Sequence, residues 1–170
     1  GDLDGGGVQE LVACSRAGEI QAFRADGEVL WAYKPAKRAA FLTLACGDVD
    51  GDGKQEVMAG GLGARAVLLS GEGEFQWERT PPPFRGIPQD VITILAADLD
   101  GDGKDEMVGG SKNWEYTAFR GDGEMMWANI IYAHSATVSC ADDFDGDGLP
   151  EIVAGNEYYR INLIDNDGKR

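Results

Sequence analysis

Residues 48–56 read Asp-Val-Asp-Gly-Asp-Gly-Lys-Gln-Glu, with acids at positions 1, 3, 5 and 9. This spacing recurs, with one substitution in the first copy, in four acidic loops: loop 1 (residues 2–10), loop 2 (48–56), loop 3 (98–106) and loop 4 (143–151). Acid-Gly pairs keep the same period, and a tryptophan follows three of them; the pairs lie at 26–27, 72–73, 122–123 and 167–168. The acidic loops and the acid-Gly pairs recur with the same spacing, which predicts a chain built from repeats of about 45 residues.

Each repeat is expected to contain four short β-strands. In the second repeat, apolar segments lie at 41–46, 56–59, 66–69 and 74–77, and an acid-Gly pair separates the last two. Such pairs are typical of tight hairpins, and no segment shows a helical period. Four strands in 40 to 50 residues are typical of a β-propeller blade. We therefore expect an all-β chain, a single propeller segment over residues 1–170 with four repeats at approximately 1–35, 36–85, 86–130 and 131–170.

The first and last blades are expected to be incomplete. The chain begins at an acidic loop, so the strand before that loop is missing from the first blade. It ends just after the acid-Gly pair at 167–168, so the last blade lacks its outer strand. This predicts part of a larger propeller or a ring closed by another copy, with self-association through open blade edges as a further possibility.

The repeats resemble the FG-GAP/VCBS family of calcium-binding β-propeller blades, including those of integrin α-subunit heads. The acidic loops, the strand at 56–61 and the acid-Gly hairpins carry the resemblance, which extends over nearly the whole chain. It implies propeller blades with calcium bound in the acidic loops. The segments 27–31 and 123–127, of the form Gly-Glu-x-x-Trp, also resemble quinoprotein-type propeller repeats.

The acidic loops have the chemistry of a calcium site. Calcium takes six to eight oxygen ligands in flexible geometry, and alternate carboxylates can turn inward together while glycine at position 6 permits a sharp bend. We expect ligands from positions 1, 3, 5 and 9 and from the carbonyl at position 7. In loops 2 to 4 these are Asp48, Asp50, Asp52, Lys54 and Glu56; Asp98, Asp100, Asp102, Lys104 and Glu106; and Asp143, Asp145, Asp147, Leu149 and Glu151.

Loop 1 departs from the pattern because Gly6 replaces the third aspartate. Its predicted ligands are Asp2, Asp4, the Val8 carbonyl and Glu10, and we expect a weaker or water-completed fourth site. An EF-hand is disfavoured throughout, since its closing glutamate falls at position 12 between helices. Magnesium prefers near-ideal octahedra, and no Cys/His cluster is present for zinc.

Charge and composition narrow the classes of partner. A net charge of −15, from 30 acids and 15 bases, argues against nucleic acid as a partner. No run of about eighteen apolar residues is present, so no membrane span is expected. Calcium is abundant enough to fill modest sites outside the cell. We therefore expect a secreted, cell-surface or periplasmic location.

The blade face opposite the acidic loops is expected to bind a ligand. Arginine and aromatic residues gather in its loops, as in many binding surfaces. The candidate residues are Arg85, Lys112, Trp114, Tyr116, Tyr132, His134, Tyr158 and Tyr159. Ordinary loop decoration is the competing interpretation, and a carbohydrate or a protein would suit such a face.

The sequence leaves enzymatic activity open and favours a non-catalytic protein. His134 is the single histidine, and neither a nucleophile-base pair nor an open metal position stands out, so no catalytic residue is predicted. The leading hypothesis is a calcium-stabilised extracellular module for adhesion or ligand recognition. The alternatives are the propeller of a calcium-dependent polysaccharide lyase or quinoprotein-like enzyme, and an assembly subunit that joins through blade edges.

Overall fold

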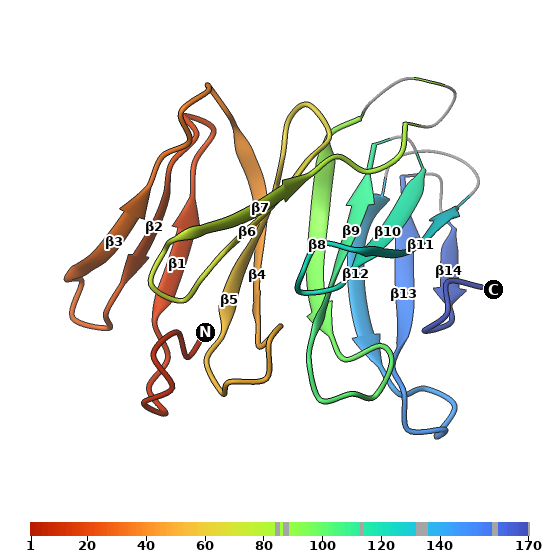
Figure 1. Ribbon diagram of the computed structural model, residues 1–170. Coiled ribbons are helices and arrows are strands. Elements are labelled where there is room, and N and C mark those ends of the chain that lie inside the picture. The colour runs from red at the N-terminus through yellow and green to blue at the C-terminus, as the bar shows by residue number, and fades with distance from the viewer. Residues whose placement is uncertain (84–85, 87–88, 113, 132–135, 158–159, 170) are drawn as a thin grey trace.

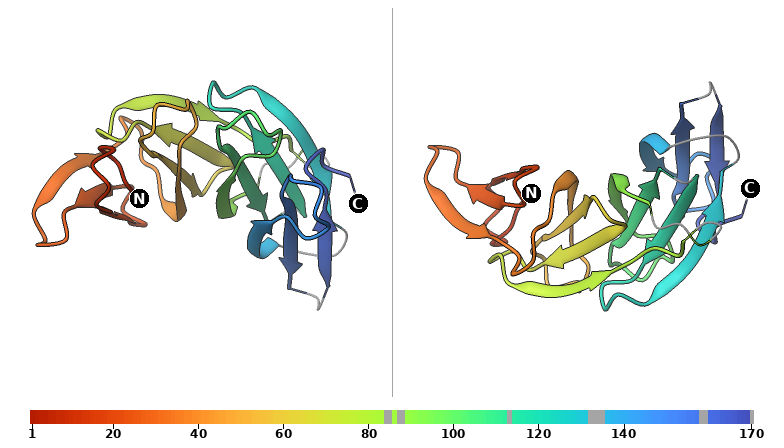
Figure 2. Two further views of the ribbon diagram at one scale, coloured as in Figure 1. Left: turned by 90° about the horizontal axis from the view of Figure 1, so that it is seen from below. Right: turned by 90° about the horizontal axis from the view of Figure 1, so that it is seen from above.

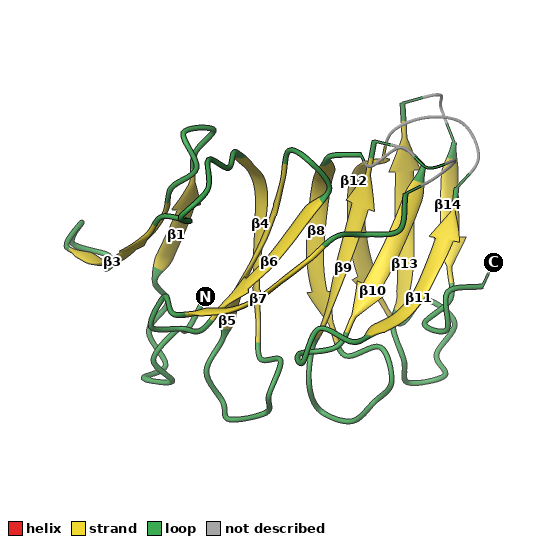
Figure 3. Cartoon of the chain, turned by 45° about the horizontal axis from the view of Figure 1, so that its top comes forward, coloured by secondary structure: helices red, strands yellow, loops and turns green. Residues whose placement is uncertain are grey.

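The computed structural model describes residues 1–83, 86, 89–112, 114–131, 136–157 and 160–169, which contain fourteen strands and no helix (Figures 1 and 3). The strands form four antiparallel sheets in chain order, and the first and last sheets have three strands each. The expected all-β fold with incomplete first and last blades is therefore confirmed. The sheets are β1 (Leu11–Cys14), β2 (Ile20–Phe23) and β3 (Val29–Tyr33); β4 (Phe41–Gly47), β5 (Glu56–Gly61), β6 (Arg65–Leu69) and β7 (Phe75–Arg79); β8 (Val91–Ala97), β9 (Glu106–Ser111), β10 (Glu115–Phe119) and β11 (Met125–Ile130); and β12 (Ala136–Asp142), β13 (Glu151–Asn156) and β14 (Ile161–Ile164).

The four sheets follow one another around an arc that does not close (Figure 2). Strands β4, β8 and β12 lie on the inner side of the arc, where β8 packs beside both of the others. Strands β7 and β11 lie on the outer side. Each complete sheet therefore runs from the inside to the outside of the arc in chain order, as in a propeller blade.

The hydrophobic core lies between blades and not within them. One cluster joins the first two blades through Ile20 and Val57, a second joins blades two and three through Leu68 and Met107, and a third joins the last two. All residues of β5 and β9 are buried because both faces of these middle strands pack against neighbouring blades. No blade buries its apolar faces alone, so the blades depend on one another for stability.

Tryptophans of the outer strands fasten each blade to the next. The indole N–H of Trp31 donates to the Gly71 carbonyl at 2.8 Å, and that of Trp77 donates to the Gly121 carbonyl at 2.7 Å. Trp127 makes the corresponding bond to Asn166, at 2.8 Å. A Cβ added at Gly73, where φ is +83°, would lie 2.5 Å from the Trp31 ring. The tryptophan and the acid-Gly pair therefore share one period because they meet across each blade junction.

The described part of the chain contains no helix that is long and apolar enough to cross a membrane.

The Trp77 contact yields a stability prediction. The substitution Trp77→Phe keeps an aromatic ring but leaves the Gly121 carbonyl without its donor, so we expect a loss of about 1–2 kcal/mol. For a chain of this length that corresponds to a fall in Tm of about 3–6 °C in a thermal melt. The control is Gln76→Ala, on the same strand at an exposed position, which should leave Tm nearly unchanged. Equal melting of the two variants would contradict the proposed junction.

Candidate metal sites

The four acidic loops lie on one side of the arc, at the bottom of Figure 1. Loops 2, 3 and 4 each connect the inner strand of a blade to its second strand, and loop 1 leads into β1. The closing glutamates Glu56, Glu106 and Glu151 are the first residues of β5, β9 and β13. The pairing between the two flanking strands therefore fixes where loops 2, 3 and 4 start and end.

Three carboxylates converge in every loop. One oxygen from each of positions 1, 3 and 9 comes within 4.8 Å of the other two, which is close enough to share one cation. The groups are Asp2, Asp4 and Glu10; Asp48, Asp50 and Glu56; Asp98, Asp100 and Glu106; and Asp143, Asp145 and Glu151. The sequence-predicted ligands at these positions are thus brought together in all four loops.

Backbone N–H groups hold the converging carboxylates in position. In loop 2 the Asp48 carboxylate accepts from Gly51 N at 2.7 Å and from Gly53 N at 2.9 Å. The closing Glu56 accepts from Val49 N at 3.0 Å. The same three bonds recur in loops 3 and 4. Gly51 and Gly53 have φ of +79° and +87°, a left-handed conformation that glycine adopts most readily.

The position-5 aspartates lie outside the converging groups. The Asp52 carboxylate accepts a hydrogen bond from Lys54 N at 2.9 Å, and Asp102 and Asp147 make the equivalent contacts at the same distance. They shape the loop as turn residues, and their coordination of metal stays a prediction, as does that of the carbonyls at position 7. Loop 1, with Gly6 at this position, retains the same three-carboxylate group as the others.

Burial and crowding perturb the closing glutamates. Glu56 is 7% exposed and Glu106 is 3% exposed. Burial, together with the neighbouring aspartates of the same loop, raises the pKa of each to about 7, against the lowering effect of the backbone hydrogen bond. A cation in the loop would offset both effects, because it replaces lost hydration and neutralises the repulsion.

Unpaired buried oxygens also fit a cation. Asp2 Oδ1 and Glu151 Oε1 are buried without a hydrogen-bond partner among the described residues. Each belongs to a converging group. Buried carboxylate oxygens normally find a donor or a metal. The donor set is all oxygen, which suits calcium and excludes a Cys/His zinc site in these groups.

Successive loops are linked through position 8, which the sequence analysis did not single out. Gln55 N donates to the Asp2 carbonyl at 2.9 Å, and the Gln55 side chain accepts from Asp2 N at 3.0 Å. Asp105 repeats this double bond with Asp48, at 2.7 and 3.0 Å. In loop 4 the residue is Pro150, which has no N–H to donate. A periodic polar residue before the closing glutamate is the signal that could have revealed this link.

Three of the predicted ligand-face residues lie within the described part of the chain, and ligand binding by this face stays a prediction. Tyr116 is fully buried in the core between blades three and four, so its placement on a binding surface was wrong; β10 begins one residue earlier and carries it inward. Lys112 is exposed and pairs with Asp90 at 3.3 Å, and Trp114 is half-buried beside it. The remaining candidates lie outside the described residues; they are Arg85, Tyr132, His134, Tyr158 and Tyr159.

A groove of about 470 Å³ lies between the outer parts of blades one and two. Lys34 and Lys37 line it together with Tyr33 and Phe75, as do Arg65 and Glu78, which pair with each other at 3.3 Å. The two aromatic rings stack with 6.4 Å between centroids. Cations beside an accessible aromatic pair give this groove the character of a recognition surface.

Comparisons with known proteins agree on the fold. The chain is similar to the Vibrio cholerae biofilm matrix protein Bap1 (22% identity, TM-score 0.73), covering 99% of this chain and 26% of Bap1. It is similar to the rhamnogalacturonan lyase PL11 of Bacillus licheniformis (22% identity, TM-score 0.68), covering 99% and 40%. It is also similar to BBS1N, solved in complex with ARL6DN (11% identity, TM-score 0.67), covering 91% and 42%. This chain thus spans less than half the length of each.

No curated protein sequence matches the chain significantly. The family model of the FG-GAP-like repeat matches residues 48–109, which run from the start of loop 2 to the middle of β9. The match identifies an FG-GAP-like repeat within residues 48–109, and the similar solved structures agree with the propeller-type fold of the chain.

Proposed function

We propose that the chain is a calcium-stabilised β-propeller module that recognises a protein or carbohydrate ligand without catalysis. The observation that carries the proposal is the three-carboxylate group, which recurs in four consecutive loops on one side of the arc. Calcium is the cation of choice because it accepts carboxylate and carbonyl oxygens in flexible numbers. Clustered acids on a chain of net charge −15 would otherwise repel one another.

In blades two, three and four, the metal would act as a clip between the inner strand and the second strand. Positions 1 and 3 follow the inner strand, whereas the glutamate at position 9 opens the second strand. A cation held by all three joins the two strands at the end where the ladder stops. The loop-to-loop hydrogen bonds then connect neighbouring clips along loops 1, 2 and 3.

The recognition surface would lie away from the metal groups. The groove carries Lys34 and Lys37 on a strongly acidic protein, whereas Arg65 is paired with Glu78 at 3.3 Å. Its Tyr33–Phe75 pair offers a flat apolar face. Such a surface suits an acidic sugar or an acidic protein segment. The likeness to a biofilm matrix protein and to BBS1N, solved in complex with ARL6DN, supports a recognition role.

A calcium-dependent site also favours a secreted, cell-surface or periplasmic location, where free calcium is high. The second candidate function is the propeller portion of a polysaccharide lyase. The likeness to rhamnogalacturonan lyases, at 21–22% identity, is the observation that favours it.

Calcium should raise the melting temperature. Each site adds about 2.7 kcal/mol at a free calcium concentration 100 times its Kd. The substitution Asp50→Asn removes a converging charge but keeps the oxygen that accepts from Asp52 N. It should therefore abolish the part of the calcium-induced rise in Tm that one site contributes, as measured by differential scanning calorimetry. Asp26→Asn is the matched control, because Asp26 also accepts a backbone bond in a turn but belongs to no converging group. Equal Tm in chelator and in millimolar calcium would refute calcium binding.

Calcium-free protein should lose stability as the pH rises. The folded pKa of Glu106, about 7, lies above its ordinary value of 4.5, so the folded state holds the proton more tightly than the unfolded chain does. The stability from this group is fully present below about pH 4.5 and is lost as the pH rises through 7. In melts at pH 5 and pH 8, Glu106→Gln should lose less stability than the wild type, by an amount on the order of 2 kcal/mol.

The exposed hairpin residue Glu124 provides the control for this pH experiment. Glu124→Gln should follow the wild-type pH dependence. If the Glu106 and Glu124 variants gave the same pH dependence, the raised pKa of Glu106 would be ruled out as the cause.

Binding and cleavage can be separated with polysaccharides. We expect the calcium-loaded chain to be retained on immobilised polygalacturonate through Lys34 and Lys37, and the double substitution Lys34→Glu, Lys37→Glu to weaken retention. Size-exclusion chromatography of polygalacturonate and rhamnogalacturonan after incubation should show undegraded polymer. Shortened chains would establish the lyase alternative and overturn the non-catalytic role.

A further inference from the structure

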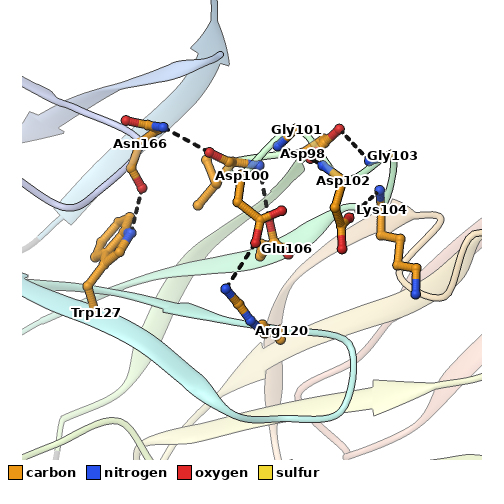
Figure 4. A network of polar contacts seen from close by, with 11 residues as sticks. Asp98, Asp100, Gly101, Asp102, Gly103, Lys104, Glu106, Arg120, Trp127 and Asn166 are labelled. Carbon is orange, nitrogen blue, oxygen red and sulfur yellow. Dashed lines mark hydrogen bonds and ion pairs between the residues drawn. The ribbon is translucent and has the colours of Figure 1, made fainter.

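Among the described ion pairs, loop 3 is the acidic loop in which an arginine pairs with one of the converging carboxylates. Arg120 follows β10, and its Nη2 lies 2.9 Å from Asp100 Oδ2. Asp100 is one of the three converging carboxylates of loop 3. Figure 4 shows the Arg120 side chain reaching the loop from the turn beneath it.

This arrangement occurs once among the ion pairs of the described residues. Arg24, at the corresponding turn of the first repeat, pairs with Glu28 at 2.7 Å and not with its loop. The second repeat has Ser70 there, and the fourth has Asp165. Lys54 of loop 2 pairs with Glu72, which lies outside every converging group. Within the described residues, loop 3 is therefore the one whose predicted ligand carboxylate is paired with an arginine.

The guanidinium is held close to the carboxylates. The side chains of Arg120 and Asp100 are 40% and 33% exposed, so water screens the pair only in part. The charge of Arg120 also lowers the pKa of Glu106, against the stronger effect of burial. Arg120 Nη1 is buried without a hydrogen-bond partner among the described residues. The guanidinium thus brings one positive charge to a carboxylate that a calcium ion would share.

Arg120 also lines a cavity of about 490 Å³ between blades two and three. Trp77 and Lys104 share this lining. Asp50, Glu56 and Glu106 line the same cavity, so the space beside the guanidinium is acidic as well as open. This space gives the Arg120 side chain room to leave Asp100.

We propose that Arg120 is a resident counter-cation that competes with calcium for Asp100 and makes loop 3 fill at a higher calcium concentration than loops 2 and 4. The proposal rests on calcium binding by these loops. Without metal, Arg120 relieves the repulsion within the group. When calcium binds, the ion must displace the guanidinium from Asp100 and overcome its repulsion. Loops 2 and 4 then act as structural sites, while loop 3 responds to changes in calcium.

A calcium titration followed by ¹⁵N-¹H NMR of the full chain can test each loop separately. The amides of Gly53, Gly103 and Gly148 each donate to the first aspartate of their own loop, at 2.9, 2.9 and 3.0 Å. We expect the Gly103 midpoint to lie at higher calcium than the other two. In Arg120→Gln it should move about fivefold lower, as expected for removal of a partly screened charge pair.

Two further variants separate charge from structure. Arg120→Lys keeps the positive charge and should keep the Gly103 midpoint near the wild-type value. Arg24→Gln removes an arginine from the equivalent turn and should leave all three midpoints in place. An unchanged or raised Gly103 midpoint in Arg120→Gln would overturn competition by Arg120 while calcium binding stood. Amides that failed to respond in every loop would overturn the proposed function as well.

Discussion

Mutual repulsion of three carboxylates is the constraint on which this structure depends. Within each acidic loop the chain brings three acids to within 4.8 Å of one another and buries one of them in most loops. Backbone N–H groups at the loop glycines supply part of the compensation, as with Gly53 and Asp48. Hydrogen bonds to one oxygen cannot neutralise the whole group, and a cation of the kind we propose would relieve the remaining repulsion.

Neighbouring blades are joined at two places, at their outer strands and at their acidic loops. On the outside, each tryptophan reaches the hairpin of the next blade, and on the loop side Gln55 and Asp105 bond to the preceding loop. The start of one loop is therefore fixed by the end of the next. Pro150 breaks this series by its lack of an N–H, so loop 4 is the one whose metal group is expected to act independently of its neighbour.

The repeat period was enough to predict the strands, their grouping and the converging acids at positions 1, 3 and 9. Periodicity in the sequence reveals the features that all blades share, because every blade packs against its neighbours in the same way. It could not place Tyr116, because strand β10 starts at Glu115 directly after Trp114, whose φ is +76°. It also assigned Asp52 to the metal without revealing that this carboxylate accepts from Lys54 N. Such contacts depend on local backbone geometry, which spacing alone does not specify.

Residues that depart from the repeat pattern give individual loops their own properties. Gly6 removes a turn aspartate, Pro150 removes a link between loops, and Arg120 adds a charge to one group, yet all four groups keep the same three carboxylates. A fold that needs only the shared residues tolerates change at the others. Loops of the same geometry can thus differ in their affinity for a cation, because a charge paired directly with one loop's carboxylate acts most strongly on that loop.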